Sequence, residues 1–148
     1  MELTREQAIA EHRKMWKWIS RQIMKDYKEN YSIKTIVSYK KIYIENNFKN
    51  EYVRSSCFCC SYGFSKYIYD ESAFGICYSC PLYWNTECTK TECTKGYYGS
   101  LNRIFNNATI GLVTKDSTEE YFVCEGAVKK LSRMAYKIAM LEERKDNV

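Results

Sequence analysis

Four of the eight cysteines form two pairs, Cys57-x-x-Cys60 and Cys77-x-x-Cys80, with sixteen residues between the pairs. A Cys-x-x-Cys turn places two thiolates on one edge of a tetrahedron, and a second turn completes the four-thiolate set that Zn²⁺ takes in structural sites. We therefore predict one Zn²⁺ per chain, held by these four thiolates. Since four protein ligands leave no open position for water or substrate, this zinc is expected to be structural and not catalytic.

The other cysteines of the same region leave further assignments open. Cys59 lies between the two members of the first pair and must point away from a metal that they hold. Cys88 and Cys93 are candidates to replace a member of the second pair, and Cys93 is the better substitute. Eight cysteines also permit a disulfide framework, but residues 1–30 form a charged helical stretch and not an apolar signal segment. We therefore expect a reducing cytoplasm, where paired cysteines usually bind metal.

His12 is the only histidine of the chain. A role as a zinc ligand would require it to reach the cysteine region, and a role as a general base would require a nearby nucleophile or carboxylate. Nothing in its spacing pairs it with another ligand, so a packed core histidine is the favoured interpretation.

Residue patterns typical of catalysis are missing from the sequence. It has no glycine-rich phosphate loop, no His-Glu-x-x-His and no nucleophile elbow. The acidic neighbours Glu119-Glu120 and Glu142-Glu143 are predicted in helices, where adjacent side chains point to different faces. We therefore predict that the protein is not an enzyme.

The elements expected to position the cysteines begin with a long helix. Thr4 and Gln7 form a capping box, and apolar residues follow at three- and four-residue steps as far as about Tyr27. This stripe is predicted to be core and consists of Ala8, Ile9, His12, Trp16, Ile19 and Ile23. The opposite face is basic and carries Arg13, Lys14, Lys17, Arg21, Lys25 and Lys28. A basic face suits phosphates, although a solvated helix surface is the commoner use of such residues.

The periodicity of residues 31–53 fits a helix or a strand, and we favour a short helix that ends near Asn46-Asn47. The last helix is predicted to start at Ser117 or Thr118, with two glutamates in its first turn. Its apolar face consists of Tyr121, Cys124, Val128, Leu131, Ala135, Ile138 and Leu141. Cys124 is thereby predicted to be a buried free thiol.

The predicted fold is mainly α, with long N- and C-terminal helices packed around a loop-rich four-cysteine zinc module. A length of 148 residues predicts one domain, made of a helical part over 1–53, the zinc module over 54–100 and a second helical part over 101–148. The net charge of +5 lies almost wholly within the first 50 residues and excludes imitation of nucleic acid by dense negative charge. No apolar run is long enough for a membrane span.

Four short motifs occur in a fixed order: His12-Arg-Lys-Met-Trp16-Lys-Trp18-Ile19, Cys57-Phe58-x-Cys60-x-Tyr62, Cys77-x-x-Cys80-Pro81-Leu82-x-Trp84 and Cys93-x-x-Gly96-x-Tyr98. The series resembles small cysteine-rich proteins of phages and prophages of Gram-positive bacteria, and among them a zinc-binding type II anti-CRISPR protein that inhibits Cas9. The resemblance implies the same four zinc ligands, with Cys93 as a fifth motif cysteine. Three residues depart from the pattern. Cys59 and Cys88 are extra cysteines, and Leu101 stands where a tryptophan is expected.

The resemblance implies a phage-encoded interaction protein in the cytoplasm of a bacterial host. Its expected partner is a host defence nuclease, Cas9 or the Cas9–guide RNA complex, bound by protein contact so that loading of target DNA is hindered. Tyr67, Tyr69, Tyr83 and Tyr98 are candidate anchors of that contact. The alternative is a zinc-containing nucleic-acid-binding module that uses the basic N-terminal helix. Steep weakening by salt distinguishes nucleic-acid binding from a protein complex with an apolar centre.

Overall fold

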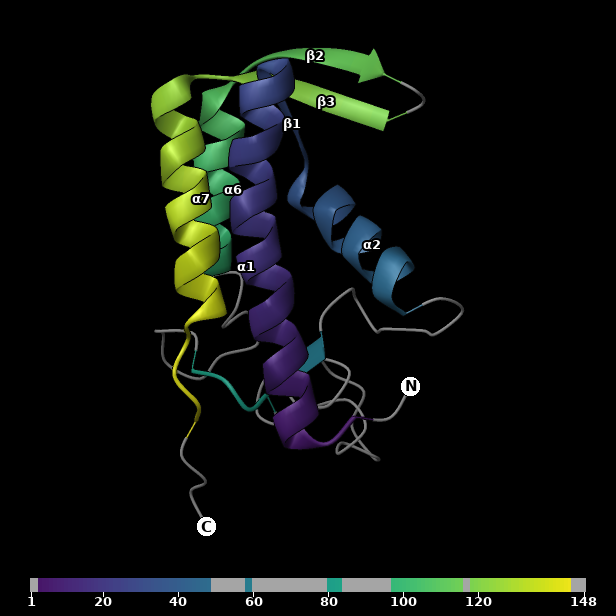
Figure 1. The fold of residues 1–148 in the computed structure, drawn as a ribbon. Helices are drawn as coiled ribbons and strands as arrows, with labels where there is room; N and C mark the ends of the chain where they lie inside the picture. The colour runs from purple at the N-terminus through teal and green to yellow at the C-terminus, as the bar shows by residue number, and fades with distance from the viewer. Residues whose placement is uncertain (1–2, 49–57, 60–79, 84–96, 116–117, 145–148) are drawn as a thin grey trace, which may run out of the picture.

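The computed structural model describes residues 3–48, 58–59, 80–83, 97–115 and 118–144 (Figure 1). In chain order the elements are α1 (Arg5–Asn30), β1 (Ser32–Lys34), α2 (Ile36–Asn47), α6 (Tyr97–Ala108), β2 (Thr109–Lys115), β3 (Thr118–Val123) and α7 (Glu125–Ala139). The described chain is mainly helical, as predicted, and a small three-stranded sheet adds to the helices. None of the helices in these ranges is long and apolar enough to cross a membrane.

α1 begins at the predicted capping box. The Thr4 hydroxyl accepts a hydrogen bond from the backbone N–H of Gln7 at 3.1 Å, and the Gln7 side chain accepts one from the backbone N–H of Thr4 at 2.9 Å. The helix continues to Asn30, and Tyr31 then closes it in the left-handed conformation, with φ 58°. The predicted apolar stripe is confirmed, since Ala8, Ile9, His12, Trp16, Ile19 and Ile23 are all buried.

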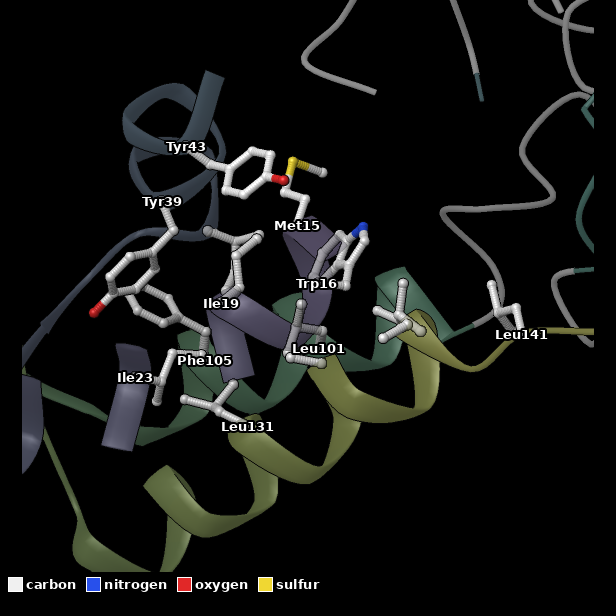
Figure 2. Packing of buried hydrophobic residues seen from close by; sticks show 14 of the residues in the cluster. Met15, Trp16, Ile19, Ile23, Tyr39, Tyr43, Leu101, Phe105, Leu131 and Leu141 are labelled. Atoms are coloured by element: carbon white, nitrogen blue, oxygen red, sulfur yellow. The ribbon is translucent and has the colours of Figure 1, made fainter. Parts of the chain in front are cut away.

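α7 lies beside α1 and runs in the opposite direction, with α6 behind the pair (Figure 1). Ser20 and Ser132 hold the two helices close, because the hydroxyl of each serine donates to the backbone carbonyl of the other, at 2.8 Å and 2.9 Å. The predicted apolar face of the last helix is confirmed for Val128, Leu131, Ala135, Ile138 and Leu141, which are buried. Leu101 and Phe105 of α6 complete this layer of the core (Figure 2).

The favoured helix within residues 31–53 is confirmed as α2, which ends at Asn47. Thr35 caps its start, since the Thr35 hydroxyl accepts from the backbone N–H of Ser38 at 3.1 Å. Tyr43 points from α2 toward Met15 of α1 (Figure 2), and Tyr39 belongs to the same buried cluster. The three residues before the Thr35 cap form β1, a strand that the sequence pattern did not predict.

The sheet has the strand order β1-β3-β2, and both pairings are antiparallel. The prediction that the last helix starts at Ser117 or Thr118 is wrong, because Thr118–Val123 form the central strand β3 and α7 begins at Glu125. Tyr121 sits opposite Ile33 on one side and Leu112 on the other. Pairing on both edges favours the strand over the helix that the glutamates suggested.

α6 begins at Tyr97, within the last residues of the span 54–100. The environment of one cysteine differs from expectation. Cys124 was predicted to be buried on a helix face, and this is wrong: it occupies the N-cap of α7 and is an exposed free thiol. Cys124 does not lie on the buried helix face because α7 starts one residue after it.

Candidate metal centre

Of the four predicted zinc ligands, Cys80 lies among the described residues, and it is buried, with 7% of its surface exposed. Cys57, Cys60 and Cys77 lie outside the described residues, as do the alternative ligands Cys88 and Cys93. Among the residues that are described, no group of three or more His, Cys, Asp or Glu side chains could hold a metal ion. The four-cysteine site therefore stays a prediction.

The residues between Cys57 and Cys60 are anchored to α1 and α2. Phe58 is fully buried and meets the rings of Tyr43 and Phe48, with centroids 6.2 Å and 5.1 Å away. Cys59 is also fully buried, and its thiol donates to the backbone carbonyl of Ala8 over 3.9 Å. Cys59 therefore points into the core.

The residues that follow Cys80 are anchored to the chain beyond α7. Leu82 is buried and forms an antiparallel bridge with Glu143. The backbone N–H of Tyr83 donates to the carbonyl of Glu142 at 2.9 Å, and that of Arg144 donates to the carbonyl of Pro81 at 2.7 Å. These bonds fix the direction in which the chain leaves Cys80.

Arg5 joins this second anchor to the start of α1. Its guanidinium donates to the Glu143 carboxylate at 3.1 Å and to the backbone carbonyl of Arg144 at 2.8 Å. Arg5 and Ala8 are three residues apart, about 4.5 Å along a helix axis. The chain bordering both predicted cysteine pairs is thus attached to the first two turns of α1. Sequence reasoning missed the Arg5 contact, because its partner lies 138 positions away.

His12 lies fully buried between α1 and α7, as predicted for a core histidine. Its Nε2–H donates to the backbone carbonyl of Ile138 at 2.8 Å, which fixes the tautomer because a carbonyl can only accept. Burial lowers the pKa of His12 from 6.5 to about 4; the charges of Lys40 and Arg13 act in the same direction, and the hydrogen bond opposes them. His12 is therefore neutral and structural.

A buried charged cluster connects the far end of α1 to the sheet. The Lys34 ammonium lies 3.6 Å from the carboxylates of both Asp26 and Glu120, which are almost completely buried. Tyr39 donates to Asp26 at 2.9 Å, and Gln22 also donates to Asp26 at 2.9 Å. Burial raises the pKa of the Tyr39 hydroxyl, so it remains a donor. These groups serve the fold, and sequence reasoning missed them because they come from four separate elements.

Comparisons with protein-family models, with curated proteins and with solved structures find no match for this chain. Function is therefore inferred from the residues, their contacts and their charges.

Proposed function

We propose that the protein is a non-enzymatic interaction protein, stabilised by one structural Zn²⁺ on Cys57, Cys60, Cys77 and Cys80, that inhibits a host defence nuclease. Cas9 of a type II CRISPR system, with or without its guide RNA, is the partner to which the motif series points. Inhibition proceeds by contact with the nuclease and hinders the loading of target DNA.

The observation that carries the metal proposal is the common anchoring of the two cysteine regions. Phe58–Cys59 is attached to α1 at Ala8, and the chain after Cys80 is attached to α1 through Arg5. This arrangement supports a site in which both pairs bind one ion. Four cysteine thiolates fit Zn²⁺ by their chemistry, and a bound ion would add folding free energy to the region that carries them.

The described titratable groups support a binding role over a catalytic one. His12 is buried and neutral, and the buried carboxylates Asp26 and Glu120 face Lys34. Tyr83, three residues after Cys80, exposes 46% of its surface, which makes it the described member of the predicted tyrosine anchors. Exposed aromatic side chains supply much of the energy at protein interfaces. Of the other anchors, Tyr67 and Tyr69 are outside the described residues, and Tyr98 lies in the first turn of α6.

The metal proposal is tested by elemental analysis of the purified chain. We expect one zinc per chain, lost in Cys60→Ser and in Cys77→Ser. Cys124→Ser is the matched control, because this exposed thiol lies at the start of α7 and should leave the zinc content unchanged. Absence of metal from the wild-type protein, or full retention in both ligand variants, would refute the site.

The partner proposal is tested by mixing the zinc-loaded protein with Cas9, alone and with guide RNA, and measuring complex formation and binding of target DNA. We expect a complex that persists as salt rises and reduces DNA binding. Tyr83→Ala should weaken the complex by roughly 1–2 kcal/mol, whereas Tyr136→Ala, an equally exposed tyrosine on α7, should not. If neither form of Cas9 is bound, the inhibitor proposal fails.

A further inference from the structure

Basic residues gather on the outer side of the α1 and α7 pair. The α1–α7 basic face consists of Lys14, Lys17, Arg21, Lys25 and Lys28 on α1 and Lys129, Lys130, Arg133 and Lys137 on α7. Eight of these side chains are exposed and that of Lys17 is half-buried. Acidic residues at the start of α7 and on both sides of it bring the local net charge close to zero, so the charge balance alone does not reveal the α7 half.

Contacts between the two helices place both halves on one surface. Ser20 bonds to Ser132, and Arg13 donates to the backbone carbonyl of Leu141 at 3.2 Å, so the helices lie in antiparallel register along their length. The buried residues of both helices face the core, and α6 lies behind the pair (Figure 1). From Lys14 to Lys28 on α1, and through Lys130, Arg133 and Lys137 on α7, the basic side chains recur at three- and four-residue steps on the opposite side, which for a helix is a single face. Lys129 lies four residues before Arg133 and one turn from it on the same face.

Positive charge is concentrated on this face, and the described part of the chain neutralises little of it. It holds nine of the 23 Lys and Arg residues, whereas residues 126–140 contain no acid and residues 14–28 contain only Asp26, which is buried. Within the described residues, Lys14 is the only one of the nine with a carboxylate in ion-pair range, Glu11 at 3.5 Å. Carboxylates elsewhere, such as Asp26, Glu120 and Glu143, are paired with cations away from this face.

We propose that the α1–α7 basic face binds the sugar-phosphate backbone of nucleic acid. From Lys14 to Lys28 the face extends about 21 Å along α1, a length over which duplex DNA presents on the order of 12 phosphates. Seven of the nine residues are lysines. Lysine is depleted at protein–protein interfaces but serves well as a point charge for phosphate, and Arg21 and Arg133 add forked donors. The composition therefore favours phosphates over an acidic protein.

This inference does not rest on the proposed inhibition of Cas9. It concerns the sides of α1 and α7, whereas the metal proposal concerns the end of the bundle at Arg5 and Ala8. A protein that ignores Cas9 but binds nucleic acid would refute the proposed function and support the α1–α7 basic face.

The test measures binding of the full zinc-loaded chain to a short random-sequence RNA duplex, a DNA duplex of the same length and poly-glutamate, over a series of salt concentrations. We expect the logarithm of the association constant for the duplexes to fall with log salt with a slope of about −4 or steeper. Poly-glutamate should bind at least tenfold more weakly than the duplexes.

Three double variants with the same change in charge localise the effect. Arg21→Gln/Arg133→Gln should lose at least about tenfold in affinity at low salt and reduce the slope by about 2. Lys41→Gln/Arg103→Gln, at exposed positions of α2 and α6 outside the face, should change affinity less than about threefold. Lys28→Gln/Lys129→Gln should behave like the first pair, and melting temperatures identify any variant that folds poorly. Equal losses in all three variants, poly-glutamate binding as tight as duplex binding, or no duplex binding would overturn the proposal.

Discussion

One imidazole in the centre of the bundle makes stability depend on pH. In the unfolded chain His12 has an ordinary pKa of 6.5, and in the folded chain burial lowers its pKa to about 4. Between these values the unfolded state binds a proton that the folded state does not. The contribution of His12 to stability is therefore complete above pH 6.5 and is lost as the pH falls toward 4.

We accordingly predict that the free energy of unfolding falls by about 2 kcal/mol more in the wild type than in His12→Gln when the pH is lowered from 7 to 5. Denaturant unfolding at both pH values measures this difference. Because His12 is the only histidine, the variant removes the histidine contribution completely. Equal losses in both proteins would mean that His12 is accessible and protonated in the folded state.

Tyr31 carries a backbone cost at the end of α1. It adopts φ 58°, a conformation that costs most residues about 1 kcal/mol and costs glycine or asparagine little. With 68% of its surface exposed, Tyr31 has little burial to lose beyond the ring contact with Tyr27. We predict that Tyr31→Gly raises the free energy of unfolding by about 0.5 kcal/mol and that Tyr31→Ala does not. Thermal unfolding of both variants checks the sign; a gain from alanine as large as that from glycine would rule out the backbone explanation.

At the scale of elements, Lys34 is the link between α1 and the sheet. It stands on β1 between a carboxylate of α1 and one of β3, and its backbone N–H also donates to Tyr39 of α2 at 3.0 Å. Breaking a buried ion pair costs several kcal/mol because the remaining charge is left without a partner. Lys34 is about a quarter exposed, which reduces that cost.

We predict that Lys34→Met lowers the free energy of unfolding by about 2 kcal/mol, since Asp26 and Glu120 then face each other without a cation. The triple variant Asp26→Asn/Lys34→Met/Glu120→Gln should recover at least half of the loss. Lys41→Met, an exposed lysine of α2, should change stability by less than about 0.5 kcal/mol. A neutral Lys34→Met would show that the carboxylates do not need this cation.

Local signals were sufficient where the residues that form an element also stabilise it. Thr4 and Gln7 specify the start of α1 through bonds within four residues, and the apolar steps that follow predicted its buried face. The same was true of the buried residues of α7, whose spacing is independent of where the helix begins.

Non-local pairing decided what the sequence left open. Thr118, Glu119 and Glu120 suggest a helix start, but Tyr121, Phe122 and Val123 favour strands and pair with residues near position 33 and position 112. The Arg5–Glu143 contact and the Lys34 cluster join residues more than 80 positions apart, beyond the reach of any periodicity. For the candidate site, the cysteine spacing predicted the ligands. The contacts that anchor the adjacent residues, Phe58–Cys59 and Leu82–Tyr83, are non-local and were found only in the structure.

At the scale of the whole molecule, metal and core should be separable. The α1, α6 and α7 core is held by apolar burial and by the Ser20–Ser132 bonds. Of the predicted ligands, Cys80 is the described one, and it is a single member of this large cluster. We predict that chelation releases amide protection around Cys59 and Leu82 while the amides of α1 beyond Trp16 and of α7 remain protected. Hydrogen exchange followed by mass spectrometry, with and without chelator, measures both regions. Uniform loss of protection would show that the zinc holds the entire fold.

The antiparallel seating of α7 on α1 also bears on synthesis. Ribosomes make the chain from the N-terminal side at about 5–20 residues per second, so α1 waits roughly 5–20 s before α7 begins to emerge. During that interval Trp16, Ile19 and Ile23 lack the surface that buries them. The nascent protein therefore presents an apolar stripe to chaperones, and a ribosome that stalls before residue 125 leaves a fragment that cannot close its core.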